Sequence, residues 1–195
     1  MRYWKVLDGR ESTNGGSCRW RLRVWAPEIP NPEPCVCGYH LCRDEQVLGW
    51  LGPTICEAEI HPDAKVVECG DKIVVSRCRI IRECTGWTER TAREFACDCA
   101  ARALRREHRA GCRPDRRSYA AVRVARRYAR GEATRKELSA AMAAAWDVAG
   151  AAARAAARAA AGAAARAAAW DAARAAAWDA ARKWQYKRLL RLLEA

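Results

Sequence analysis

The chain has 195 residues, with 36 Lys and Arg against 23 Asp and Glu, which gives a formal net charge of +13 at pH 7. No apolar run approaches the length of a membrane span, and the first residues lack the hydrophobic segment of a secretory signal, so we expect a cytoplasmic protein with no membrane association. The 11 cysteines are odd in number, which in a cytoplasmic chain indicates reduced thiols rather than a disulfide framework.

The positive charge is concentrated in the second half of the chain. Residues 1–88 carry 12 basic and 12 acidic side chains, residues 89–140 carry 15 and 7, and residues 141–195 carry 9 and 4. Nearly all of the excess is arginine. A basic region of this kind favours an acidic partner, which is either an acidic protein surface or a nucleic acid.

The first half has the alternation and the turn residues of a small mixed domain. Residues 18–25, CRWRLRVW, place Trp20, Leu22 and Val24 on one face and arginines on the other, which is typical of a half-buried strand. The four prolines of residues 26–34 predict a loop, and Asp44 is placed to cap a short helix. We expect strands over residues 2–8, 18–25, 39–42, 54–60, 64–69 and 72–81. The pattern predicts an α+β protein whose β-rich domain covers residues 1–86.

Helical patterns replace the strands after the turn at residues 85–88. We expect one helix over residues 89–109 and a second that Asp115 caps and Gly131 ends. Thr134 and Glu137 have the spacing of a capping box, which would begin a third helix. Residues 87–195 are therefore predicted to form an all-α domain rich in Ala, Arg and Trp, whose main element is one long helix.

The long alanine-rich helix is expected to run from about Thr134 to Glu194, because alanine and arginine have high helix propensity. It would be about 90 Å long if unbroken. Gly150 and Gly162 are its weak points, and whether the helix is straight or folds back at either glycine stays open. Alanine buries little surface, so tryptophans are the expected packing anchors. These anchors are Trp146, Trp170, Trp178 and Trp184.

Arginines recur every four to eight residues along much of this helix and also occur in the helix before it. Such a row is typical of a solvated helix face, and it also suits a surface that binds an acidic protein or a nucleic acid. The residues predicted to form this surface are Arg116, Arg117, Arg123, Arg127, Arg154, Arg158, Arg166, Arg174 and Arg182.

Four residues with soft side chains, Cys35, Cys37, His40 and Cys42, lie close together in the first half. Zinc sites use four nitrogen or sulfur ligands, usually as two separated pairs, and this cluster lacks that spacing. The alternative is that the cysteines are small buried apolar residues. We therefore expect no cofactor, with zinc as the alternative.

No catalytic motif is present in the chain. The one plausible couple is His40 with Glu57 or Glu59 on neighbouring strands, an arrangement similar to ADP-ribosyl-transfer sites, which place a His and a Glu on strands. We expect a protein without catalytic residues and keep a transferase with this His and Glu site as an alternative.

Two stretches resemble known families. The first is GYHLC at Gly38–Cys42, followed by the glutamate strand at Glu57–Ile60 and by Gly70–Lys72; it resembles a domain of unknown function found in phage and bacterial proteins. The second combines REFACDCAARAL with RPDRRSYAAVRVARRYARGEAT within residues 88–195; it resembles a family assigned as immunity proteins of polymorphic toxin systems. The second resemblance implies a protein that neutralises a toxin by binding it, and neither resemblance carries residue roles to this chain.

These observations predict a non-enzymatic interaction protein of an immunity-like or phage–host conflict type. Its basic helical half would bind an acidic protein partner. The alternatives are a nucleic-acid-binding protein that uses the Arg- and Trp-rich helices, and the transferase. The sequence leaves the identity of the partner and the oligomeric state open.

Overall fold

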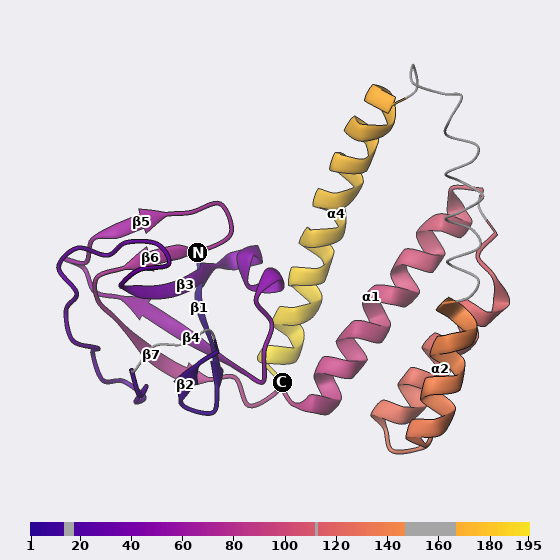
Figure 1. Ribbon diagram of the computed structural model, residues 1–195, viewed down its shortest axis with the longest axis horizontal. Helices are drawn as coiled ribbons and strands as arrows, with labels where there is room; N and C mark the ends of the chain where they lie inside the picture. The colour runs from indigo at the N-terminus through magenta and orange to yellow at the C-terminus, as the bar shows by residue number, and fades with distance from the viewer. Residues whose placement is uncertain (14–17, 112, 147–166) are drawn as a thin grey trace. The chain divides into compact units, whose positions relative to one another are not determined.

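The computed structural model describes residues 1–13, 18–111, 113–146 and 167–195, with the backbone alone described for residues 167–177 (Figure 1). These residues form two compact units, one of Met1–Thr88 with Arg182–Ala195 and one of Glu89–Ala181. An antiparallel sheet in the first unit and helices in the second confirm the predicted α+β class. The sequence analysis had assigned Arg182–Ala195 to the helical domain, whereas the structure groups them with the sheet.

Seven strands of the described chain form one antiparallel sheet in the order β5-β6-β3-β1-β4-β7, with β2 paired to β1. A short 3-10 helix, η1 (Asp44–Gly49), follows β3. The prediction that Asp44 caps this helix was wrong, because Arg43 is the capping residue and Asp44 is the first residue of the helix. The strands are β1 (Tyr3–Asp8), β2 (Glu11–Ser12), β3 (Tyr39–Arg43), β4 (Thr54–Ile60), β5 (Val66–Glu68), β6 (Ile73–Val75) and β7 (Cys78–Glu83).

The sheet curls, because its strand order and its chain connections require it. Only Ser76 and Arg77 separate β6 from β7, a link that spans at most about 10 Å. In the strand order these two strands are four spacings apart, which would be about 19 Å across a flat sheet. The inner face of the curled sheet therefore encloses one core. Its buried residues are Leu7, Trp20, Ala26, Tyr39, Leu41, Cys56, Ala58, Ile73, Val75, Cys78 and Ile80.

The prediction of one long strand over residues 72–81 was wrong, because the chain leaves one half of the sheet for the other within this stretch. Ser76 marks the crossing: its N–H donates to the carbonyl oxygen of Lys65 at 3.0 Å, and its Oγ accepts from the N–H of Lys65 at 2.9 Å. Before the crossing β6 pairs with β3, and after it β7 pairs with β4. The alternation of apolar residues is the same before and after such a change of partner strand, so the sequence pattern does not indicate it.

The predicted strand over residues 18–25 was also wrong. Trp20 is buried as expected, but Leu22 and Val24 are 56% and 53% exposed. Arg23 has a φ of 60°, which takes the backbone out of the extended region at the centre of the stretch. Its N–H still donates to the carbonyl oxygen of Ile80 at 2.7 Å, so the segment follows β7 without forming a regular ladder with it.

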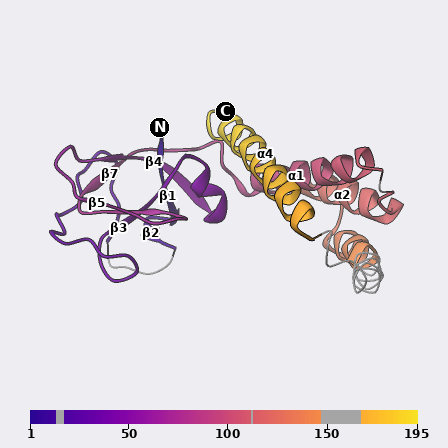
Figure 2. The ribbon, with the colours of Figure 1, turned by 90° about the horizontal axis from the view of Figure 1, so that it is seen from above.

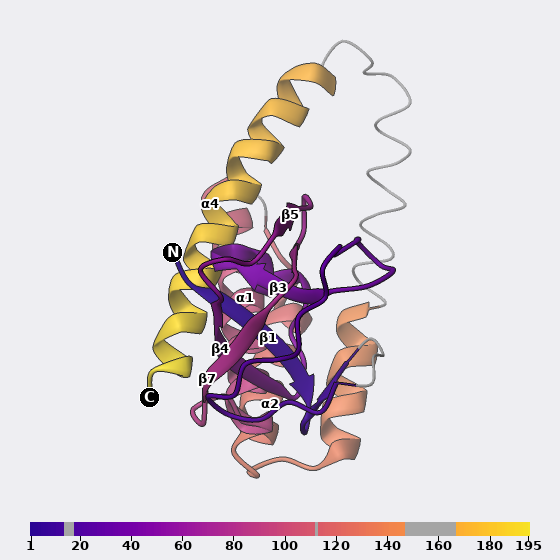
Figure 3. The ribbon, with the colours of Figure 1, turned by 90° about the vertical axis from the view of Figure 1, so that its left-hand side faces the viewer.

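The C-terminal end of α4 (Ala167–Leu193) packs within the first unit, on the face of the sheet opposite the core (Figure 3). The indole N–H of Trp4 in β1 donates to the Tyr186 hydroxyl at 3.2 Å. Leu189 is fully buried and Leu193 is 2% exposed. The apolar C-terminus predicted from the sequence therefore covers the sheet, as an amphipathic helix end does when it supplies the second layer of a small domain.

The second unit begins with α1 (Glu89–Arg109) and α2 (Arg116–Ala129), which lie side by side (Figure 2). Arg126 of α2 forms an ion pair with Asp98 of α1 at 2.8 Å. The predicted caps are confirmed: the Asp115 carboxylate accepts from the N–H of Arg117 at 2.8 Å, and Thr134 and Glu137 form the reciprocal hydrogen bonds of a capping box.

The long helix is described at its two ends. Residues 135–146 and α4 are helical, whereas Gly150 and Gly162, with the predicted fold-back positions, lie outside the described residues. None of the helices in the described ranges is both long enough and apolar enough to cross a bilayer.

Candidate functional sites

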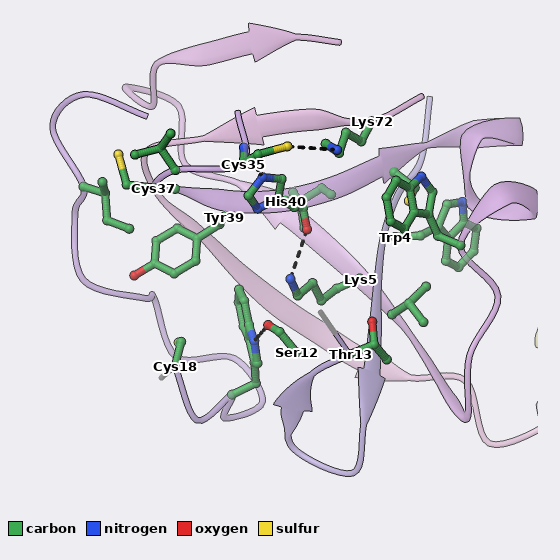
Figure 4. Close-up of a pocket in the computed structure, with 18 of the residues that line it drawn as sticks. Trp4, Lys5, Ser12, Thr13, Cys18, Cys35, Cys37, Tyr39, His40 and Lys72 are labelled. Carbon is green, nitrogen blue, oxygen red and sulfur yellow. Dashed lines mark hydrogen bonds between the residues drawn. The ribbon is translucent and has the colours of Figure 1, made fainter. Parts of the chain in front are cut away.

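The sheet contains a cavity of about 830 Å³ beside the place where β1 and β3 cease to pair (Figure 4). These two strands are in register only at Tyr3↔Arg43 and Trp4↔Cys42. Beyond these two pairs, Lys5 and Val6 of β1 and Tyr39–Leu41 of β3 line the cavity. A gap between two strands leaves backbone groups that other groups must satisfy, so this is a place where a sheet can admit a ligand.

Lys5 satisfies one of these backbone groups. Its ammonium donates to the carbonyl oxygen of His40 at 3.1 Å and lies 5.0 Å from the ring centroid of Trp20. The side chain is on the inner face of the sheet and is only 6% exposed. Burial lowers the pKa of Lys5 below its ordinary 10.5. The cation makes no ion pair with any described carboxylate.

His40 lies between Lys5 and Lys72 among the residues that line the cavity (Figure 4). Its Nε2 accepts from the backbone N–H of Cys35 at 3.2 Å, so the proton of the neutral ring is on Nδ1. Burial, followed by the charges of Lys5 and Lys72, lowers the pKa of His40 below 6.5. The neutral imidazole therefore predominates at pH 7 and offers one N–H donor.

The couple of His40 with Glu57 or Glu59 is not brought together. β1 lies between β3 and β4, so the histidine and the glutamates are not on neighbouring strands. Glu57 is engaged by Arg82 at 2.7 Å and Glu59 by Arg79 at 2.6 Å, both on β7. Neither glutamate is among the residues that line the cavity. The prediction that these residues lie on adjacent strands was wrong, because the strand order does not follow from the sequence.

The cysteines of the candidate zinc cluster point to different surroundings. Cys37 donates through Sγ to the carbonyl oxygen of Asn31 at 3.0 Å, whereas Cys35 is exposed. Cys42 is buried, and burial raises the pKa of its thiol to about 12. Within the described residues, no three His, Cys, Asp or Glu side chains converge on a position for a metal ion. The zinc alternative therefore finds no ligand set in this geometry.

Four exposed arginines form a stripe along α2, which we call the arginine stripe: Arg116, Arg123, Arg127 and Arg130. Steps of seven and four residues keep these positions within about 60° around the helix axis. Arg127 is partly engaged, because it donates to the carbonyl oxygen of Glu132 at 2.8 Å and lies 3.5 Å from Glu137. The other three make no ion pair within the described residues.

The remaining arginines of the predicted surface either have partners within the protein or lie where their side chains are not described. Arg117 is held by Asp115 at 3.1 Å. Arg182 donates to the carbonyl oxygen of Glu45 at 2.9 Å in the first unit, so it contributes to docking the C-terminus rather than to the surface of the second unit. The other predicted positions cannot be placed: Arg154, Arg158 and Arg166 lie outside the described residues, and the side chain of Arg174 is not described.

The predicted packing role of the tryptophans is not seen at two positions. Trp146 is 80% exposed and Trp178 is 65% exposed. Trp184 is half-buried, and the side chain of Trp170 is not described. An indole that is four-fifths exposed contributes little to packing, so Trp146 is available to a partner.

Lys5 and Lys72, the two lysines that line the cavity, were not predicted from the sequence. A signal for Lys5 was present, because it occupies the same face of its strand as Tyr3 and Leu7, where an apolar residue is expected. A signal for Lys72 was absent, since it adjoins a turn at which lysine is common.

Comparison with known proteins finds no matching family model, no matching curated protein and no matching solved structure. The two resemblances drawn from the sequence therefore stay predictions.

Proposed function

We propose that the protein is a non-enzymatic interaction protein whose helical unit binds an acidic protein partner, as an immunity or phage–host conflict protein would. The observation that carries this proposal is the arginine stripe. Arg116, Arg123 and Arg130 are exposed on one side of α2 and make no ion pair within the described residues. Residues 89–140 also carry a net charge of +8, which attracts an acidic surface before contact.

The geometry of the stripe suits carboxylates. The guanidinium group is planar and binds a carboxylate through two parallel hydrogen bonds. From Arg116 to Arg130 the stripe extends about 21 Å along the helix axis. A partner helix that carries Asp or Glu at intervals of seven residues would match this spacing.

Two exposed apolar residues favour a protein partner over a nucleic acid. Met142 and Trp146 are 59% and 80% exposed and are four residues apart on one helix, so their side chains are neighbours. Tryptophan and arginine are enriched among the residues that dominate protein interfaces, and methionine adapts to apolar partners. Contacts with the phosphates of a duplex, by contrast, need only basic side chains and gain nothing from an exposed methionine.

The proposal is tested with labelled probes of equal charge, whose binding is followed by fluorescence anisotropy over a series of salt concentrations. The probes are an acidic peptide with Leu and Phe at helical spacing, a polyglutamate peptide and a duplex DNA. The variants are Trp146→Ala and the triple charge reversal Arg116→Glu, Arg123→Glu and Arg130→Glu. The matched control reverses three exposed arginines of the first unit, namely Arg10→Glu, Arg19→Glu and Arg21→Glu.

We expect the amphipathic acidic peptide to bind most tightly and to lose on the order of tenfold in affinity in the triple variant, since three surface ion pairs of about 0.5 kcal/mol each are lost. Trp146→Ala should weaken the same peptide and leave polyglutamate unchanged. The control should bind as the wild type does. Tighter binding of DNA, with a steep salt slope and no effect of Trp146→Ala, would favour the nucleic-acid alternative and contradict the proposal. Absence of binding to all three probes would also contradict it.

A further inference from the structure

The cavity in the sheet has a lining that combines positive charge with aromatic walls. Lys5, Lys72 and His40 supply the polar groups, while Trp20 and Trp50 supply flat apolar surface. No Asp or Glu is among the described residues that line it. Such a lining excludes a cationic ligand and favours an anion that also carries a ring.

Lys5 is the strongest indication that the cavity holds an anion. A buried ammonium is normally paired with a carboxylate, because removing a charge from water is costly. Here the groups that could act on Lys5 as anions are the thiols of Cys18, Cys42 and Cys78, and burial raises the pKa of each thiol. The thiols therefore stay neutral at pH 7 and do not balance the charge of Lys5. A bound anion would balance it.

A second cation lies at the far end of a short chain of contacts. Lys5 donates to the His40 carbonyl oxygen, His40 accepts from the Cys35 backbone, and the Lys72 ammonium lies 3.7 Å from Cys35 Sγ. Lys72 is also 4.9 Å from the ring centroid of Trp50, which fixes its position at the cavity. Figure 4 shows Lys5 and Lys72 on either side of His40. Two cations that line one cavity suit a doubly charged group better than a single carboxylate does.

We propose that this cavity is a binding site for a phosphorylated nucleoside, with the phosphate between Lys5 and Lys72 and the base against the tryptophans. The volume of about 830 Å³ lies within the range of about 300–1,000 Å³ that small-molecule sites occupy. Lysine binds phosphate as a point charge. Every nucleobase can stack on an aromatic ring, whichever polar groups the base carries. The site is independent of the arginine stripe, which belongs to the other compact unit.

The test is calorimetric titration of the full chain with AMP, with adenosine and inorganic phosphate as probes that each carry half of the ligand. Lys5→Met and Lys72→Met remove the two cations. Lys187→Met is the matched control, because Lys187 is exposed in the same unit and does not line the cavity. Circular dichroism establishes whether each variant is folded. If Lys5→Met does not fold, Lys72→Met carries the test.

We expect AMP to bind the wild type and to bind each cavity variant at least tenfold more weakly, with Lys187→Met unchanged. Adenosine and phosphate should each bind at least tenfold more weakly than AMP. AMP should also slow the alkylation of Cys35 at the mouth, a readout that a merely structural role of the lysines would not move. The proposal is overturned if AMP does not bind, if both folded lysine variants bind it as the wild type does, or if phosphate alone binds as tightly as AMP.

Discussion

Lys5 Nζ lies 3.1 Å from the carbonyl oxygen of His40, at the position where β1 and β3 stop pairing. The side chain thereby takes over an acceptor that a regular strand would have satisfied. The same hydrogen bond holds a cation inside the curled sheet, where it is only 6% exposed. The break in the sheet, the cavity and its positive charge are therefore parts of one local arrangement.

The binding of AMP should depend on pH through Lys5. Burial lowers the pKa of the free Lys5 ammonium below 10.5, and a bound phosphate would raise it again. Affinity is therefore highest below the lowered pKa and falls as the pH rises through it, because the neutral amine no longer attracts the anion. The thiols of Cys42 and Cys78 have a pKa of about 12, and His40 is already neutral at pH 7. Titrations between about pH 8 and 11 check this, since a phosphate whose second pKa is about 6 is dianionic throughout; an affinity that does not fall over this range would contradict the role of Lys5.

Replacement of Leu189 by alanine should weaken the docking of the C-terminus. Leu189 is fully buried, and a buried Leu→Ala change typically costs about 2–5 kcal/mol. Lys187→Ala is the control, because Lys187 is exposed on the same segment and its loss should cost less than about 0.5 kcal/mol. Urea unfolding followed by tryptophan fluorescence measures both. Equal stability of the two variants would mean that the C-terminal segment does not pack on the sheet.

Replacement of Gly86 by alanine should also weaken the docking of the C-terminus, because Gly86 lies against the backbone of Leu192. A Cβ atom at Gly86 would lie 2.2 Å from the carbonyl oxygen of Leu192, which is backbone and cannot rotate away. We expect a cost of at least about 1–3 kcal/mol and a lower Tm. Gly70→Ala is the matched control, because a Cβ there meets nothing within 4 Å. Thermal unfolding of the two variants should separate them; a Gly86→Ala variant as stable as Gly70→Ala would show that Leu192 lies elsewhere in solution.

The thiols should react with iodoacetamide in an order set by burial. Cys35 is exposed, whereas Cys56 and Cys78 are buried and burial raises the pKa of each to about 12. At pH 8 a thiol with that pKa is ionised to about one part in 10⁴, and the thiolate is the reactive form. Peptide mapping by mass spectrometry should find Cys35 modified well before Cys56 and Cys78. Simultaneous modification of the three would indicate that the sheet opens on the timescale of the reaction.

Features that depend on neighbouring residues could be predicted from the sequence. The Asp115 cap and the Thr134 and Glu137 box were predicted because each forms within three residues. Four of the strands, β1, β3, β4 and β5, were placed within a few residues, because alternation and turn residues are also local signals. The α+β class follows from these elements alone.

Features that depend on distant pairing could not be predicted. The alternation of residues 18–25 gave no warning that Arg23 adopts a positive φ, and the apolar run around Ser76 hid the change from β3 to β4 as partner. The contact of Trp4 with Tyr186 joins residues 182 positions apart. The candidate sites divide in the same way: Arg116, Arg123 and Arg127 were predicted from the sequence of one helix, although Arg130 was missed, whereas the cavity of Lys5 requires the strand order.

The two proposed binding sites are separate, one in each compact unit, and a crossed titration tests this most directly. The charge-reversed variant Arg116→Glu, Arg123→Glu and Arg130→Glu and the variant Lys5→Met are each titrated with AMP and with the amphipathic acidic peptide. We predict that the first variant loses the peptide and keeps AMP, and that the second loses AMP and keeps the peptide. Loss of both ligands in one folded variant, or of neither ligand in both variants, would contradict the account.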